Sequence, residues 1–185
     1  MVEKLKGEVR VKMEKSLETL RHEFSQIRTG RASPALLDAI RVEYYGTMVP
    51  IPHIANVSAP EARLLVIQPW DKSTLPAIEK AILGSDLGIT PSNDGNVIRL
   101  SIPPLTEERR QELVRIVRRL AEDTRVAVRN IRREAVERLR KAQKDGELSE
   151  DESRRAQKEV QEITDEYIKK VGEALAQKEA EILEE

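Results

Sequence analysis

The sequence predicts an α+β protein in which a long antiparallel three-helix bundle is interrupted by a small inserted β/α/β domain. Near both ends of the 185-residue chain, apolar residues recur in steps of three and four, as they do along amphipathic helices. All nine prolines and five of the eight glycines fall between Gly30 and Leu105, where strand and turn patterns replace the helical one. We therefore expect residues 1–29 and 106–185 to form the bundle and residues 30–105 the insertion.

The first two helical segments lie on either side of the insertion. The second runs from Thr106, which we expect to be its N-cap, to about Asp145, and Gly146 is expected to end it. The apolar positions of the first segment are Val2, Leu5, Val9, Met13, Leu17, Leu20, Phe24 and Ile27. Those of the second are Leu113, Val117, Leu120, Val128, Ile131 and Ala135.

The third helix begins at Ser149, which forms a capping-box pattern with Glu152. Its apolar positions are Ala156, Val160, Ile163, Tyr167, Val171, Ala174 or Leu175, and Ile182. All three patterns stay close to a 3.5-residue repeat, which predicts long helices packed at shallow angles. The short turn at Gly146 makes the second and third helices antiparallel neighbours, and the first helix closes the core.

The insertion contains short elements separated by turn residues. We expect three strands, over Ile40–Tyr44, Arg63–Gln68 and Asn96–Ile102. A helix over Ser73–Leu83 could cross over between strands. We also expect a turn at Asn93-Asp94-Gly95 and a capped helix start at Ser33-Pro34. Trp70 is interpreted as a packing residue at a strand end rather than a binding platform. Tyr44 and Tyr45 place one ring on each face of a strand, so one ring is expected in the core.

Two chain crossings join the insertion to the bundle. The outgoing crossing is Arg28-Thr29-Gly30-Arg31, and the returning crossing is Pro103-Pro104-Leu105-Thr106. Gly30 permits unusual backbone angles, whereas the paired prolines are stiff. The crossings are either two ordinary helix-boundary turns or a hinge that sets an interdomain angle.

A row of arginines occupies one face of the second helix. At about 100° per residue, they fall in an arc of about 100° that is distinct from the apolar face. The row is Arg115, Arg118, Arg125, Arg129, Arg132 and Arg133. No lysine occurs between Arg109 and Arg140, and the arginine fork matches phosphate geometry. We expect this face to present guanidinium groups to solvent, where they could bind nucleic-acid phosphates; the alternative is an ordinary solvated charged face.

The net charge of −1 hides an asymmetry along the chain. Residues 106–146 hold 13 basic and 8 acidic residues, a balance of +5, whereas residues 147–185 hold 6 basic and 13 acidic residues, a balance of −7. A near-neutral total argues against indiscriminate coating of nucleic acid and favours one localised basic patch.

Several functional classes find no support in the residues. There is no cysteine, no apolar run near the roughly 20 residues that span a bilayer, and no apolar stretch of a secretory signal at the start. We therefore expect a soluble, cytoplasmic protein without a membrane partner. His22 and His53 have no partner at metal-ligand spacing, and no phosphate loop or nucleophile turn is present. Neither a metal nor enzymatic activity is expected.

Five motifs, in register over essentially the whole chain, resemble the bacterial ribosome-recycling factor family. They are Arg28-Thr29-Gly30-Arg31-Ala32-Ser33-Pro34, Val42-Glu43-Tyr44-Tyr45-Gly46, Ser85-Asp86-Leu87-Gly88, Pro103-Pro104-Leu105-Thr106-Glu107-Glu108-Arg109-Arg110 and Val126-Ala127-Val128-Arg129-Asn130-Ile131-Arg132-Arg133. The resemblance implies an L-shaped protein of about transfer-RNA size, with the insertion hung on a two-strand hinge.

The resemblance also implies a function and a site. In this family the bundle lies on large-subunit ribosomal RNA, and elongation factor G uses GTP to split the post-termination ribosome, so the chain itself needs no cofactor. The RNA-contacting residues match Arg129 and Arg132, with Arg28 and Arg31 implicated near the hinge, and the helical arc adds Arg133. We expect a monomer. A plain helical scaffold and a ribosome-associated enzyme remain the alternatives.

Overall fold

The computed structural model describes residues 1–183, and the chain divides into two compact units. Within the described residues, the first unit joins Met1–Arg28 to residues 107–183, and the second is Thr29–Thr106. The first contains three long helices and the second contains two small sheets with short helices. The predicted α+β class, a helical bundle with an inserted β-containing domain, is confirmed.

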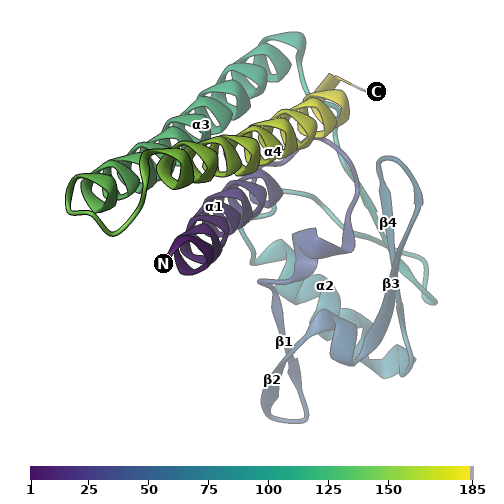
Figure 1. Ribbon diagram of the computed structural model, residues 1–185. Coiled ribbons are helices and arrows are strands. Elements are labelled where there is room, and N and C mark those ends of the chain that lie inside the picture. The colour runs from purple at the N-terminus through teal and green to yellow at the C-terminus, as the bar shows by residue number, and fades with distance from the viewer. Residues whose placement is uncertain (184–185) are drawn as a thin grey trace. The chain divides into compact units, whose positions relative to one another are not determined.

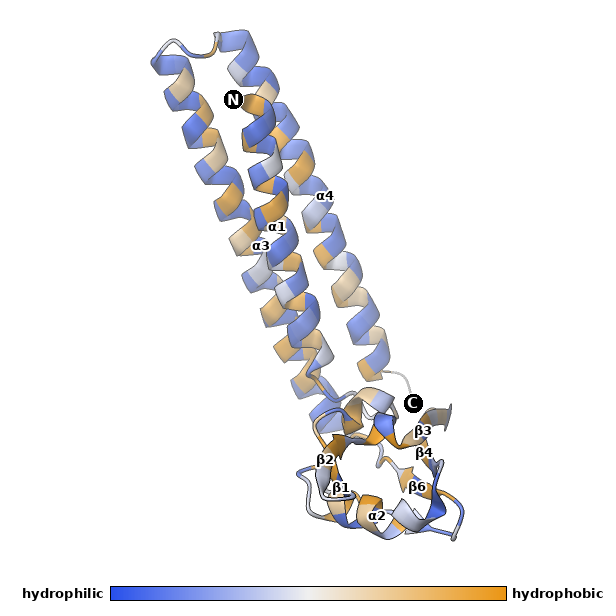
Figure 2. Cartoon of the chain, turned by 90° about the horizontal axis from the view of Figure 1, so that it is seen from below, coloured by the Kyte–Doolittle hydropathy of each residue, from blue (hydrophilic) through white to orange (hydrophobic). Residues whose placement is uncertain are grey.

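The bundle consists of α1 (Val2–Ser25), α3 (Glu107–Lys144) and α4 (Glu150–Leu183). Each helix packs along the other two (Figure 1), and hydrophobic positions recur along all three between hydrophilic ones (Figure 2). The predicted apolar face of α1 is buried from Leu5 to Phe24. On α3, Leu120 and Ile131 are only half-buried, and the core includes Ala121 and Leu139 instead.

The turn between α3 and α4 forms as its residues predict. Gly146 adopts φ +82°, the left-handed conformation that commonly ends a helix. The amide of Glu147 donates to the carbonyl of Ala142 at 2.9 Å, which satisfies one of the terminal carbonyls of α3. Ser149 and Glu152 then bond reciprocally: the Glu152 amide donates to Ser149 Oγ at 3.1 Å, and the Ser149 amide donates to Glu152 Oε1 at 3.2 Å. Both predicted helix boundaries are confirmed.

The inserted unit holds a two-stranded and a four-stranded sheet, and every strand pair is antiparallel. The strands are β1 (Arg41–Tyr44), β2 (Thr47–Pro50), β3 (Ala55–Glu61), β4 (Leu64–Pro69), β5 (Ser92–Asn93) and β6 (Ile98–Ser101). Strand order is β1-β2 in one sheet and β3-β4-β6-β5 in the other. Helix α2 (Leu75–Leu83) follows β4, and its Ile78 and Ile82 belong to the same core as the strands.

The three predicted strands form as β1, β4 and β6, but β2, β3 and β5 were not expected. Strand β3 has few β-branched residues and contains Pro60, which lacks an amide hydrogen. It lies at the edge of its sheet, where the missing donor is tolerated. The predicted start at Ser33-Pro34 is a short 3-10 helix, Pro34–Leu37, whose Ala35 amide is capped by Ser33 Oγ at 3.3 Å. Because β4 and β6 are antiparallel neighbours, α2 does not form a parallel crossover.

The prediction for Trp70 is wrong, because its side chain is 70% exposed. The odd-numbered residues of β4, Leu65 to Pro69, are buried, so the next even-numbered residue faces outward. The tyrosine pair is as expected in burial, since Tyr44 packs against the core and Tyr45 is exposed. The two rings do not lie on opposite faces of a strand, because they pack edge to face with their centroids 4.5 Å apart. Tyr45 lies in the β1–β2 turn with φ +48°, rather than on the strand.

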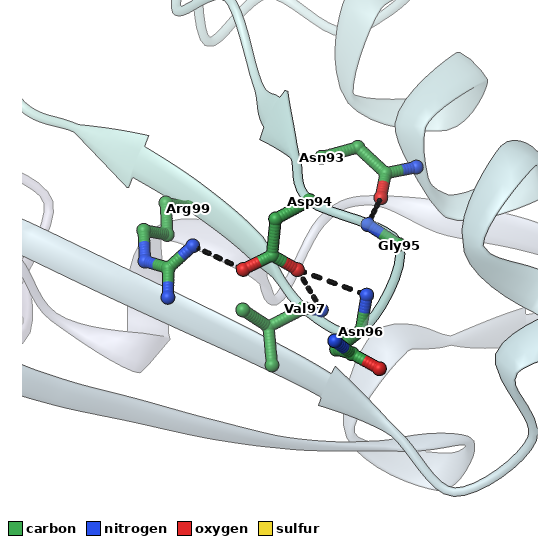
Figure 3. A network of polar contacts seen from close by, with 6 residues as sticks. All are labelled: Asn93, Asp94, Gly95, Asn96, Val97 and Arg99. Atoms are coloured by element: carbon green, nitrogen blue, oxygen red, sulfur yellow. Dashed lines mark hydrogen bonds and ion pairs between the residues drawn. The ribbon is translucent and has the colours of Figure 1, made fainter.

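The predicted Asn93-Asp94-Gly95 turn is confirmed, and it is built on the carboxylate of Asp94 (Figure 3). Asp94 Oδ1 accepts hydrogen bonds from the amides of Asn96 and Val97, both at 2.9 Å, and Asp94 Oδ2 accepts one from the Arg99 guanidinium. The Val97 amide, followed by Arg99 and the Asn96 amide, holds the pKa of Asp94 well below its ordinary value. Ionised Asp94 therefore stabilises the loop that joins β5 to β6.

Replacing Asp94 by asparagine is expected to destabilise the inserted unit in a pH-dependent way. The pKa of Asp94 is lower in the folded state than in the unfolded chain, so its contribution is fully present above the ordinary pKa of about 4 and is lost as pH falls further. Thermal unfolding of both proteins between pH 7 and pH 2.5 measures the difference. The gap between the two melting temperatures should begin to narrow below about pH 4 and be clearly smaller at pH 2.5 than at pH 7; a constant gap over this range would contradict the assignment.

Within the described residues, no helix combines the length and the apolar character that crossing a membrane requires.

Candidate nucleic-acid interface

The arginine row of α3 divides into exposed and partly buried members. Arg115, Arg118, Arg129 and Arg133 are exposed, whereas Arg125 and Arg132 are half-buried. Arg132 lies one helical turn before Val136, which is only 9% exposed. Arg132 therefore lies at the edge of the buried face of α3. The expectation that the arc is exposed to solvent therefore holds only in part for Arg125 and Arg132, which are half-buried.

Most of the row already contacts acidic or amide side chains. Arg118 Nε donates to Glu179 Oε1 of α4 at 2.6 Å, and this hydrogen bond raises the pKa of Arg118. Glu122 accepts from Arg125 at 3.2 Å and from Arg129 at 3.4 Å. Arg133 Nη2 donates to Asn130 Oδ1 at 2.9 Å. Exposed ion pairs of this kind contribute about 0–1 kcal/mol, so phosphates can replace the acidic partners at low cost.

Arg132 differs from its neighbours in its hydrogen bonding. Its Nε is buried and has no hydrogen-bond partner among residues 1–183. A buried donor without an acceptor costs about 1–3 kcal/mol. Because the atom itself is buried, an outside acceptor reaches it only if the side chain moves. The half-buried stem also restricts the motion of the side chain.

The two crossings supply the other predicted site residues. Arg28 is exposed and ends the bundle unit, whereas Arg31 is exposed and belongs to the inserted unit. Gly30 adopts φ +79°, and a Cβ added there would lie 3.2 Å from Leu105 Cγ. The outgoing and returning crossings therefore pack closely at Gly30 and Leu105, and no other residue fits position 30 without strain. Of the remaining crossing residues, Thr29 is half-buried and Pro103, Pro104 and Thr106 are exposed.

Comparison with known proteins matches nearly the whole chain to members of a single protein family. The family model for ribosome recycling factor matches residues 20–183. The ribosome-recycling factor of Carboxydothermus hydrogenoformans is 59% identical over 183 residues, 99% of each chain. That of Heliobacterium modesticaldum is 58% identical over 184 residues, 100% of each chain.

The chain belongs to the ribosome recycling factor family. A solution structure of a ribosome recycling factor matches with a TM-score of 0.75 at 45% identity, covering 98% of this chain and 97% of the other. A second structure matches with a TM-score of 0.66 at 55% identity over 100% of both chains. It shows the T. thermophilus factor and E. coli elongation factor G bound to the E. coli post-termination complex. The resemblance inferred from the five motifs is confirmed.

The contacts that hold the crossings to the inserted unit could not be predicted from the sequence. The Ala32 amide donates to the Ala62 carbonyl at 2.7 Å, and the Ile102 amide donates to the Arg63 carbonyl at 2.8 Å. Both acceptors belong to the turn between β3 and β4. Backbone groups make these contacts, so no residue type in the sequence signals them.

Proposed function

We propose that this chain recycles ribosomes after translation termination. It binds the post-termination ribosome and, together with elongation factor G and GTP, promotes dissociation into subunits and release from the messenger RNA. The observation that carries the proposal is the full-length match, at 55% identity, to a recycling factor that is bound, with elongation factor G, to a post-termination complex.

The bundle would grip large-subunit ribosomal RNA through arginines of α3. Arg132 is the central contact because it lies between Arg129 and Arg133 on α3 and matches an RNA-contacting position of the family motif. Arg129 and Arg133 flank it on the exposed side, and Arg28 and Arg31 add contacts at the outgoing crossing. The major groove of A-form RNA is too deep and narrow to be read by side chains, so phosphate contact and RNA shape dominate.

The chain would act without breaking a covalent bond. The bundle holds RNA, the inserted unit receives force from the translocase, and the crossings Arg28–Arg31 and Pro103–Thr106 form the hinge between them. GTP is hydrolysed by elongation factor G, so this chain acts as neither an enzyme nor a cofactor-dependent protein. It would work as a monomer in the cytoplasm, where ribosomes and the translocase meet.

Binding to purified large ribosomal subunits tests the RNA-gripping role. Cosedimentation at several salt concentrations should give an affinity that falls steeply with salt, because each phosphate contact releases counterions. Binding to large subunits that is absent, or independent of salt, would contradict the proposed interface and favour a plain helical scaffold.

A further inference from the structure

Helix α1 ends just before the outgoing crossing, and its last carbonyls need partners from elsewhere. Gln26 and Ile27 continue the chain in a tight turn, in which the Ile27 amide donates to the Phe24 carbonyl at 3.1 Å. The Ile27 carbonyl accepts a hydrogen bond from Lys178 Nζ at 3.3 Å. Lys178 lies on α4, near the end of the bundle where α1 finishes.

Lys178 is held in place on both sides. Its side chain is only 12% exposed, and its ammonium group also pairs with Glu181 Oε2 at 3.4 Å. Lysine is rarely buried to this extent unless it is paired. A cation beside the last carbonyls of α1 is also favoured by the helix dipole. The contact thus ties the exit of α1 to α4, directly before Arg28.

The outgoing crossing therefore begins and ends at fixed points. On the bundle side, Lys178 holds Ile27. On the side of the inserted unit, the Ala62 carbonyl holds the amide of Ala32. Only Arg28–Arg31 lie between these two anchors, and these are the residues of the proposed outgoing hinge.

We propose that Lys178 is a positioning residue that sets the bundle-side limit of the hinge. This inference rests on the proposed function, since a lever needs a fixed pivot to transmit force. Without the Lys178 contact, Gln26 and Ile27 are free to unwind, and the flexible crossing extends back towards Phe24. Force on the inserted unit then bends this longer segment instead of moving the bundle.

The test compares Lys178→Met with Lys178→Arg in the full chain. Methionine keeps the packing of the stem but removes the donor, whereas arginine keeps a donor and the charge. Lys169→Met is the matched control, because Lys169 is an exposed lysine of the same helix. Amide hydrogen exchange of Gln26 and Ile27 measures how firmly Lys178 holds the end of α1. The rate of ribosome splitting with elongation factor G and GTP measures whether this contact matters for recycling.

In Lys178→Met we expect the exchange of the Gln26 and Ile27 amides to rise about tenfold, the effect of losing one hydrogen bond. Amides in the middle of α1 should be unchanged, splitting should slow several-fold, and Lys178→Arg and Lys169→Met should behave as wild type. Unchanged exchange at Gln26 and Ile27, exchange that rises throughout the bundle, or faster local exchange with normal splitting would each overturn the proposal. If the wild-type chain does not split ribosomes, the proposed function fails instead, whatever the exchange data show.

Discussion

Replacing Arg132 by glutamine is expected to weaken binding to the large ribosomal subunit by about tenfold to a hundredfold. A hydrogen bond to a charged group contributes about 1.5–3 kcal/mol. The plot of log affinity against log salt concentration should also become shallower by about one unit of slope, because one phosphate contact is lost. Because Arg132 Nε has no acceptor among residues 1–183, the same change should leave the folding stability unchanged or slightly higher.

Arg154→Gln provides the matched control for this experiment. Arg154 is an exposed arginine of α4, and it pairs with Glu150 at 2.6 Å. Its replacement should change neither the affinity nor the salt slope. Equal effects of Arg132→Gln and Arg154→Gln, or none from either, would mean that Arg132 does not contact RNA.

Replacing Leu17 by alanine is expected to destabilise the bundle by about 2–5 kcal/mol, the usual cost of a cavity in a well-packed core. Leu17 is 1% exposed and lies within the buried face of α1. Urea unfolding followed by circular dichroism at the helical band measures the effect, because α1, α3 and α4 provide most of the helical residues.

Val11→Ala is the control on the same helix. Val11 is 70% exposed, so the change should stay within about 0.5 kcal/mol. A loss below about 1 kcal/mol for Leu17→Ala would mean that α1 does not close the bundle core.

Much of the fold follows from local signals in the sequence. The repeat of apolar residues predicts the buried face of α1, and Gly146, Ser149 and Glu152 predict both ends of the α3–α4 turn. These predictions hold because helix periodicity and capping depend on residues close together in the chain. The motif around Arg132 likewise carries the family resemblance without any structural information.

The failures concern properties that depend on distant parts of the chain. An edge position allows β3 to form despite Pro60, and an edge position is set by the other strands. Whether Arg132 is exposed depends on how closely the neighbouring helices approach α3, which a helical wheel does not describe. The anchor at Ile27 joins residues 151 positions apart, and only the folded bundle brings them together.

This chain is expected to split post-termination ribosomes only together with the translocase. Light scattering of purified post-termination ribosomes measures the separation of subunits directly. Scattering should fall when the chain, elongation factor G and GTP are all present, and should stay constant when any one of them is omitted. A chain that binds ribosomes but never lowers the scattering would contradict the lever, and a fall in scattering without elongation factor G would contradict the need for the translocase.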